Sequence, residues 1–166
     1  MSLDKKFEDI FLKITTRAAL SSYYQVGKKN KILADKVAVD TMRSELNKID
    51  MDGEIVIGEG ELDHAPMLYI GEKLGSKKGP KLDIAVDPVE GTNFAANNLP
   101  GALSVMAVAE KSNLFKAPET YMSKISANVP ERGIVDLDYS IERNIKNLSE
   151  YKNKKPENLR VCLLER

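Results

Sequence analysis

The fold is decided by one stretch, Leu82-Asp83-Ile84-Ala85-Val86-Asp87-Pro88-Val89-Glu90-Gly91-Thr92. Its first five residues form an apolar run that is typical of a buried strand. Two acids, Asp87 and Glu90, come after the run, and Gly91 then allows the backbone to approach a ligand closely. A second run, Ile55–Ile57, is followed in the same way by Gly58-Glu59-Gly60-Glu61. Two strands that end in carboxylates and glycines predict a site for divalent cations beside a phosphate.

Carboxylates at strand ends suit hard cations. Mg²⁺ and Mn²⁺ prefer oxygen ligands, and a Mg²⁺ site is often completed by one or two carboxylates and a substrate phosphate. The acidic candidates are Asp35, Glu59, Asp87 and Glu90. A helix that begins at Thr92 would turn its free N–H groups toward the phosphate. Two cations held there would activate a water and neutralise the leaving oxygen of an in-line displacement.

Each acid also has a simpler explanation. A single acid is more often a solvated or capping residue than a ligand. Asp35 is expected in the first turn of a helix, where the helix dipole favours an acid in any case. The spacing D-P-x-E-G-T after a buried strand, together with a second acidic strand end, favours the metal and phosphate site over a chance arrangement.

The composition is that of a soluble globular protein. The chain has 166 residues, 42% hydrophobic and 30% charged, which is enough for a single core. Lys+Arg and Asp+Glu both number 25, so neither nucleic acid nor a membrane is an expected partner. Cys162 is the only cysteine, which excludes an intramolecular disulfide and predicts a cytoplasmic location.

Apolar periodicity predicts the elements along the chain. One helix is expected from about residue 4 to the low twenties, and a second buries Ala38, Met42, Leu46 and Ile49 on one face. Shorter helices are expected over 67–74 and 141–151. Buried strands are expected at 55–57, 82–86, 103–109, 121–129, 133–137 and 161–164.

The segment Asp87–Thr92 resembles the signature of the metal-dependent, lithium-sensitive phosphatase superfamily. The surrounding sequence is closer still to class II fructose-1,6-bisphosphatases, including those that also take sedoheptulose 1,7-bisphosphate. The matching segments are Asn30-Lys31, Ala34-Asp35, 55–61, 65–73, 83–92, 100–102 and 117–122. They follow one another in order, so the resemblance covers essentially the whole chain.

The resemblance implies a role for each matching residue. The metal ligands, for Mn²⁺ or Mg²⁺, would be Asp35, Glu59, Asp87 and Glu90. The residues implied at the cleavage centre are Lys31, Asp35 and Thr92, with Thr92 orienting the attacking water. Substrate contacts would come from Glu90, Gly91, Thr92, Tyr121 and Arg166. His64 departs from the family, which usually has an acid there, and no catalytic role is expected for it.

The implied fold is α+β, the N-terminal α/β-sandwich half of the sugar-phosphatase fold. Residues 1–157 would form the metal- and phosphate-binding domain, and 158–166 the first strand of a truncated C-terminal domain. The second domain of the family supplies a further acidic ligand and most contacts to the sugar and the distal phosphate. A complementing C-terminal half, or a homo-oligomer, is therefore an expected partner.

The activity that the resemblance implies is removal of the 1-phosphate of fructose 1,6-bisphosphate, with the chain alone expected to be inactive. Two alternatives stay open. The chain could be a degenerate or regulatory module that keeps the fold without catalysis. It could also act on another phosphorylated small molecule, such as an inositol phosphate or a nucleotide phosphate, because the D-P-x-E-G-T core is shared.

Overall fold

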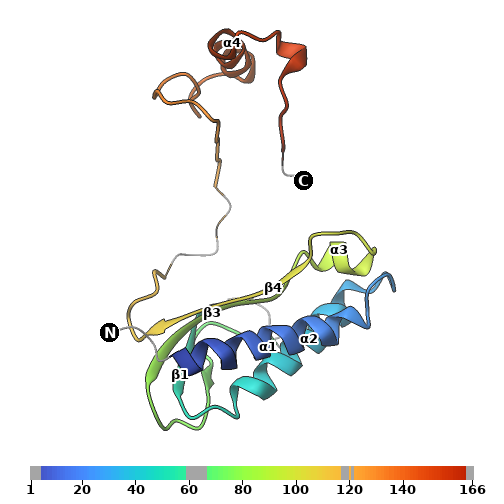
Figure 1. Cartoon of the computed structure of the whole chain (residues 1–166), viewed down its shortest axis with the longest axis vertical. Coiled ribbons are helices and arrows are strands. Elements are labelled where there is room, and N and C mark those ends of the chain that lie inside the picture. Colours follow the sequence, from blue (N-terminus) through green and yellow to red (C-terminus); the bar gives the residue numbers. More distant parts are fainter. Residues whose placement is uncertain (1–4, 59–66, 117–119, 121, 164–166) are drawn as a thin grey trace. The chain divides into compact units, whose positions relative to one another are not determined.

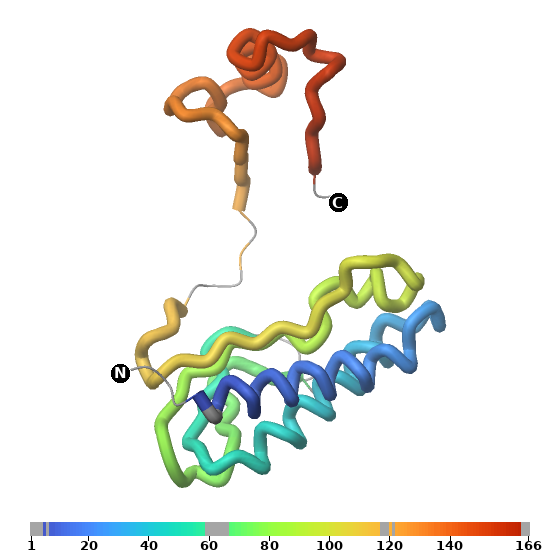
Figure 2. The backbone as a smooth tube through the Cα atoms, in the orientation of Figure 1, coloured from blue at the N-terminus to red at the C-terminus, as the bar shows by residue number. Residues whose placement is uncertain are grey.

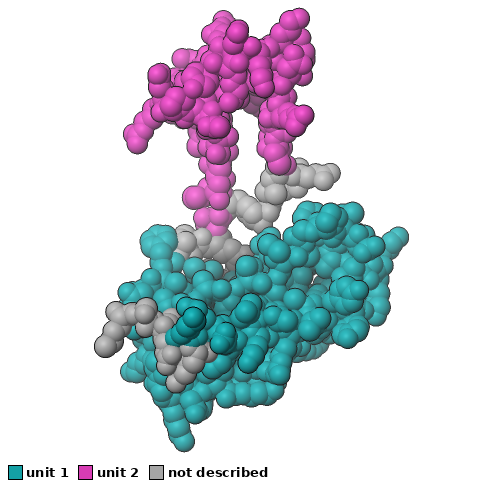
Figure 3. All heavy atoms as spheres, in the orientation of Figure 1, with its two compact units in different colours: residues 1–117 teal, residues 118–166 magenta. Residues whose placement is uncertain are grey.

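The computed structural model describes residues 5–58, 67–116, 120 and 122–163 and shows a mixed α+β protein, so the predicted fold class is confirmed. The chain divides into two compact units, Met1–Ala117 and Pro118–Arg166 (Figure 3). The domain boundary predicted at 157/158 stays a prediction. None of the described helices is long and apolar enough to cross a membrane.

The first unit is built on a four-stranded sheet with the order β2-β1-β3-β4 (Figure 1). The central strands β1 (Asp52–Ile57) and β3 (Lys81–Glu90) run parallel. The outer strands β2 (Lys73–Leu74) and β4 (Leu103–Glu110) pair antiparallel with β1 and β3. The strands predicted at 55–57, 82–86 and 103–109 are thus confirmed.

Two helices, α1 (Lys5–Tyr23) and α2 (Lys31–Leu46), lie side by side and pack on this sheet (Figure 2). Both were predicted from their apolar spacing. Helix α2 buries Ala38, Met42 and Leu46 as expected, whereas Ile49 lies beyond its end and packs against the core from the following turn. Burial of these side chains against the sheet stabilises the fold.

Strand β3 continues four residues beyond its predicted end at Val86. Its pairing with β4 matches Asp87 to Val105 and Glu90 to Leu103, so β3 carries one extra residue between these two pairs. This is a β-bulge, and it accommodates Pro88, which has no N–H to donate to a neighbouring strand. Asp87 and Glu90 therefore lie within the strand, on either side of the bulge, rather than after it.

The helix predicted over 67–74 is wrong, because only the short strand β2 forms there. Glu72 is held by the Arg43 side chain, whose Nε donates to Oε1 at 2.6 Å and whose Nη2 donates to Oε2 at 3.1 Å. Leu68 and Leu74, which precede and follow Glu72 in the chain, are fully buried. Tertiary contacts thus fix an irregular backbone where the local pattern favoured a helix.

The second unit contains the helix α4 (Ile141–Lys152), as predicted, and the 3₁₀ turn η1 (Pro156–Asn158). The strands predicted at 121–129, 133–137 and 161–164 are absent from the described residues of those segments, and 158–163 likewise form no strand. Met122, Ile125, Leu137 and Val161 are exposed there. A strand needs a partner for its backbone groups, and the described part of this unit offers none.

Candidate metal- and phosphate-binding site

Three elements meet at one end of the sheet: the start of α2, the end of β3 and the short helix α3 (Thr92–Ala96). The loop between α1 and α2 is hydrogen-bonded to α3. Gly27 N–H donates to the Ala95 carbonyl at 3.0 Å, and Lys29 N–H donates to the Ala96 carbonyl at 2.8 Å. These bonds tie the first turns of α2 to the helix that follows the acidic strand end.

Helix α2 begins at Lys31, one turn before Asp35. Asn30 caps the helix, and its side chain accepts a hydrogen bond from Leu33 N–H at 3.0 Å. No acid lies in the first turn, so the predicted placement of Asp35 there is wrong, and the helix dipole gives a weaker account of this residue. Lys31 and Asp35 are four residues apart and lie on the same face of the helix. Lys31 is exposed, whereas Asp35 is half-buried.

The half-buried Asp87 carboxyl interacts with the charges of both Glu90, which is exposed, and Asp35. Besides burial, Glu90 raises the pKa of the Asp87 carboxyl, whereas the backbone of Val89 lowers it. Burial, the hydrogen bond and charge of Glu90, and the charge of Asp35 together raise the pKa of Asp87 to about 6, and only the Val89 contact opposes them. Burial also raises the pKa of Asp35. The site therefore concentrates negative charge, and no ion pair is found for Asp35, Asp87 or Glu90 among the described residues.

Two buried oxygens in this site lack a partner among the described residues. Oδ1 of Asp35 and Oδ1 of Asp87 are both buried and accept no hydrogen bond. Buried carboxylate oxygens without a hydrogen-bond partner, with Glu90 near Asp87, suit a hard divalent cation, which prefers oxygen ligands. Within the described ranges, however, no three acidic, histidine or cysteine side chains already stand close enough to hold a metal ion.

The repulsion at Asp87 has a consequence for stability without metal. Because the folded state raises the pKa of Asp87 from about 3.9 to about 6, this group stabilises the fold at low pH. That contribution is lost as the pH rises through 6. Asp87→Asn should therefore stabilise the metal-free protein at pH 7.5 by about 1 kcal/mol, allowing for the partial solvent exposure. The gain corresponds to about 3 °C in Tm.

Thermal unfolding in a chelator at pH 7.5 and pH 4.5 measures this effect. At pH 4.5 the gain should fall to about a third of its value at pH 7.5, because the native carboxyl is already protonated there but the unfolded carboxyl is still mostly ionised. Asp9→Asn, at an exposed position in α1, is the control and should change Tm little at either pH. An equal gain for Asp87→Asn at both pH values would contradict the proposed repulsion.

Gly91 and Thr92 turn the chain from β3 into α3. Gly91 is the cap residue of α3 and has φ of 80°, a left-handed conformation that favours glycine. A Cβ there would lie 3.0 Å from Cδ2 of Phe94. Thr92 is the first residue of α3, the helix start considered from the sequence. Thr92 follows Glu90 by two residues, with Gly91 between them.

Four residues considered in the sequence lie outside the described residues: Glu59, His64, Tyr121 and Arg166. The structure brings together Asp35, Asp87 and Glu90, with Lys31 and Thr92 on the adjoining helix ends. It also shows the ion pair of Arg43 with Glu72, which sequence reasoning missed. The available signal was the position of Arg43 beside the buried Met42 and four residues after the buried Val39.

The whole chain is similar to one family of known proteins. Residues 6–166 match the family described as bacterial fructose-1,6-bisphosphatase, glpX-encoded. A curated relative from Synechococcus sp. (strain CC9902), named D-fructose 1,6-bisphosphatase class 2/sedoheptulose 1,7-bisphosphatase, is 44% identical over 164 residues. That alignment covers 99% of this chain and 49% of the relative. A protein of the same name from Prochlorococcus marinus (strain MIT 9312) is 45% identical over 155 residues, which are 93% of this chain and 46% of the relative. The chain thus spans about half the length of these relatives.

Proposed function

Because the chain belongs to the family of glpX-encoded bacterial fructose-1,6-bisphosphatases, we propose that its acidic site serves the metal-dependent hydrolysis of a sugar bisphosphate. The reaction is removal of the 1-phosphate of fructose 1,6-bisphosphate. The observation that carries the proposal is that Asp35 and Glu90 act electrostatically on Asp87, while one oxygen each of Asp35 and Asp87 is buried without a hydrogen-bond partner among the described residues. Such an arrangement is costly in a purely structural role and useful for binding a cation.

In this proposal Asp35, Asp87, Glu90 and Glu59 hold Mn²⁺ or Mg²⁺. When bound, such cations polarise the phosphoryl oxygens, lower the pKa of the attacking water and neutralise the leaving alkoxide. Gly91 and Thr92 present the phosphate with backbone N–H groups at the start of α3, and the Thr92 hydroxyl orients the water opposite the scissile P–O bond. Lys31, one turn before Asp35, adds positive charge beside the cleavage centre.

Substrate contacts from Tyr121 and Arg166 belong to the same proposal, as does a partner polypeptide. The relatives are about twice as long as this chain. We therefore expect the 166 residues alone to turn over substrate poorly, and a supplied polypeptide that corresponds to the unmatched half of a relative to complete the site. The alternative function is a degenerate or regulatory module that keeps the fold without catalysis.

A substrate panel tests the assigned reaction. The chain, mixed with the unmatched half of the Synechococcus relative, is given fructose 1,6-bisphosphate, myo-inositol 1-phosphate or AMP in Mn²⁺ buffer, and phosphate release is followed. We expect fructose 1,6-bisphosphate to be hydrolysed at least about tenfold faster than the others, and all release to stop in EDTA. A preference for inositol phosphate or AMP would contradict the substrate, and release that persists in EDTA would contradict the role of the metal.

A further inference from the structure

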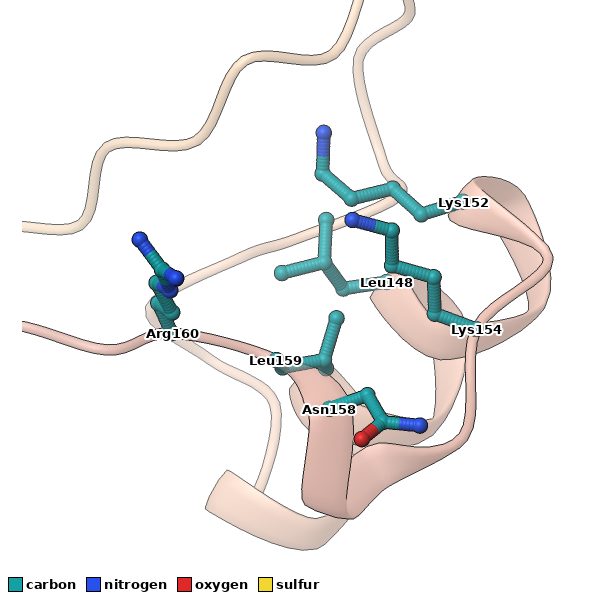
Figure 4. Close-up of a pocket in the computed structure, with 6 residues that line it drawn as sticks. All are labelled: Leu148, Lys152, Lys154, Asn158, Leu159 and Arg160. Atoms are coloured by element: carbon teal, nitrogen blue, oxygen red, sulfur yellow. The ribbon is translucent and has the colours of Figure 1, made fainter.

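The second unit holds a basic hollow of about 430 Å³ at the end of α4 (Figure 4). Its lining is Leu148, Lys152, Lys154, Asn158, Leu159 and Arg160. Three of these six side chains are cationic at neutral pH and none is acidic. Figure 4 shows the three cationic ends arranged around the two leucine side chains. The hollow therefore combines positive charge with an apolar floor.

The end of α4 places two of the cations. Asn153 has φ of 48° and ψ of 48°, and this left-handed residue reverses the chain directly after the helix. Its N–H donates to the Glu150 carbonyl at 3.1 Å, and Lys154 N–H donates to the Ser149 carbonyl at 3.0 Å. The Ser149 hydroxyl also donates to the Lys154 carbonyl. Lys152 and Lys154 thus project from backbone that is fixed by hydrogen bonds.

The 3₁₀ turn η1 brings the chain back to the hollow, which Asn158, Leu159 and Arg160 help to line. Asn158 N–H donates to the Lys155 carbonyl at 2.9 Å, and Leu159 N–H donates to the Pro156 carbonyl at 3.0 Å. This turn brings Leu159 against the hollow opposite Leu148 and places Arg160 at its edge (Figure 4). The lining therefore comes from two short structured elements rather than from one flexible run.

Local acids do not neutralise this charge. Over the described residues 122–163, the ion pair found joins Lys146 to Glu150 at 3.9 Å, and neither residue lines the hollow. Lys152 Nζ donates to the Asn128 carbonyl at 3.1 Å, which leaves its charge in place. The C-terminal end of α4 carries a partial negative charge, which favours the cationic side chains of Lys152 and Lys154 there even without a ligand. It does not account for Arg160, which lies beyond the helix.

We propose that this hollow binds a soluble organic phosphate, with the phosphate held by the cations and the carbon skeleton resting on the leucines. A guanidinium such as that of Arg160 matches a phosphate with two parallel N–H donors, and lysines add point charges. The Asn158 amide adds a neutral donor. A volume of about 430 Å³ lies within the range of small-molecule sites. The proposal does not rest on the metal site, which is built from other residues.

An NMR titration of the full chain tests this site. Phenyl phosphate and inorganic phosphate are titrated separately in EDTA, so that no divalent cation supports binding elsewhere. We expect amide shifts at Lys154, Asn158 and Arg160, and about tenfold tighter binding of phenyl phosphate, because only this ligand covers Leu148 and Leu159. Absence of shifts in these residues would overturn the site, and equal affinities would overturn the organic ligand.

Matched variants distinguish binding in this hollow from nonspecific electrostatic attraction of the phosphate to the basic surface. Lys154→Gln with Arg160→Gln should weaken phenyl phosphate binding at least about tenfold. Lys155→Gln removes the same type of charge from the next residue, which does not line the hollow, and should change the affinity less than about twofold. Equal losses in the double variant and the Lys155 variant would overturn the proposal. Preserved binding in the double variant would overturn it as well.

Discussion

Phosphate release from fructose 1,6-bisphosphate should rise about a hundredfold or more when the 166-residue chain is mixed with the half of a relative that it does not match. Among the described residues no three acidic, histidine or cysteine side chains stand close enough to hold a metal ion. In the proposed reaction, a site that stays open to water would stabilise the developing charge only weakly. Each missing stabilising group in such a site costs on the order of 100-fold in kcat. A completed site should recover these losses together.

The measurement is the rate of phosphate release in Mn²⁺ buffer with the chain alone, the supplied half alone and the mixture. The half from the Synechococcus relative is suitable, because the matched part of that protein is 44% identical to this chain. Turnover by the chain alone at the rate of the mixture would contradict the need for a partner. A mixture that associates but releases no phosphate would favour the non-catalytic module.

Asp87→Asn should lower kcat of the mixture by about a hundredfold or more. Loss of a residue that merely supports a metal ligand typically costs 10- to about 100-fold in metal affinity or activity, and Asp87 is proposed to bind the metal directly. The amide is nearly isosteric with the carboxyl and removes the repulsion at Glu90, so the variant should fold at least as well as the parent chain.

The expected combination is unusual, because a destabilising substitution cannot produce it: activity falls while the metal-free protein becomes more stable. Steady-state kinetics of the variant mixture, beside Asp9→Asn as a surface control, measures the first part. Activity of the Asp87 variant within about threefold of the parent would show that the carboxylate does not hold the metal.

The core of the first unit could be predicted from sequence because its pattern is local. The apolar spacing of Ala38, Met42 and Leu46 fixes one face of α2, and all three are buried. The run Leu82–Val86 likewise predicts the central strand. Its continuation to Glu90 was missed because Pro88 is typical of a strand end, and only pairing with β4 across the bulge keeps residues 87–90 in the sheet.

The remaining errors come from contacts between distant residues. The segment 67–72 has helical spacing, but its backbone is fixed by Arg43, which lies 29 residues before Glu72. The apolar residues between 122 and 137 suggested strands, yet a strand requires a neighbouring backbone that a one-dimensional pattern does not specify. That Asp87, Glu90 and Thr92 lie close together was easier to predict, since they are neighbours in the chain; their roles stay a prediction.

The convergence of Asp35 with Asp87 was more difficult to predict from physical reasoning alone. These residues are far apart in the sequence, and only the resemblance to a known family joined them. The structure supplies the physical link through the hydrogen bonds of Gly27 and Lys29 to α3, which hold the start of α2 beside the end of β3.

Direct binding of Mn²⁺ tests the central claim that the acids at this end of the sheet form a metal site. Isothermal titration of the 166-residue chain with MnCl₂ at pH 7.5 should give saturable binding in the parent and in Asp9→Asn. Binding should weaken at least about tenfold in Asp87→Asn. Equal Mn²⁺ affinity in the parent chain and the Asp87 variant would contradict the account.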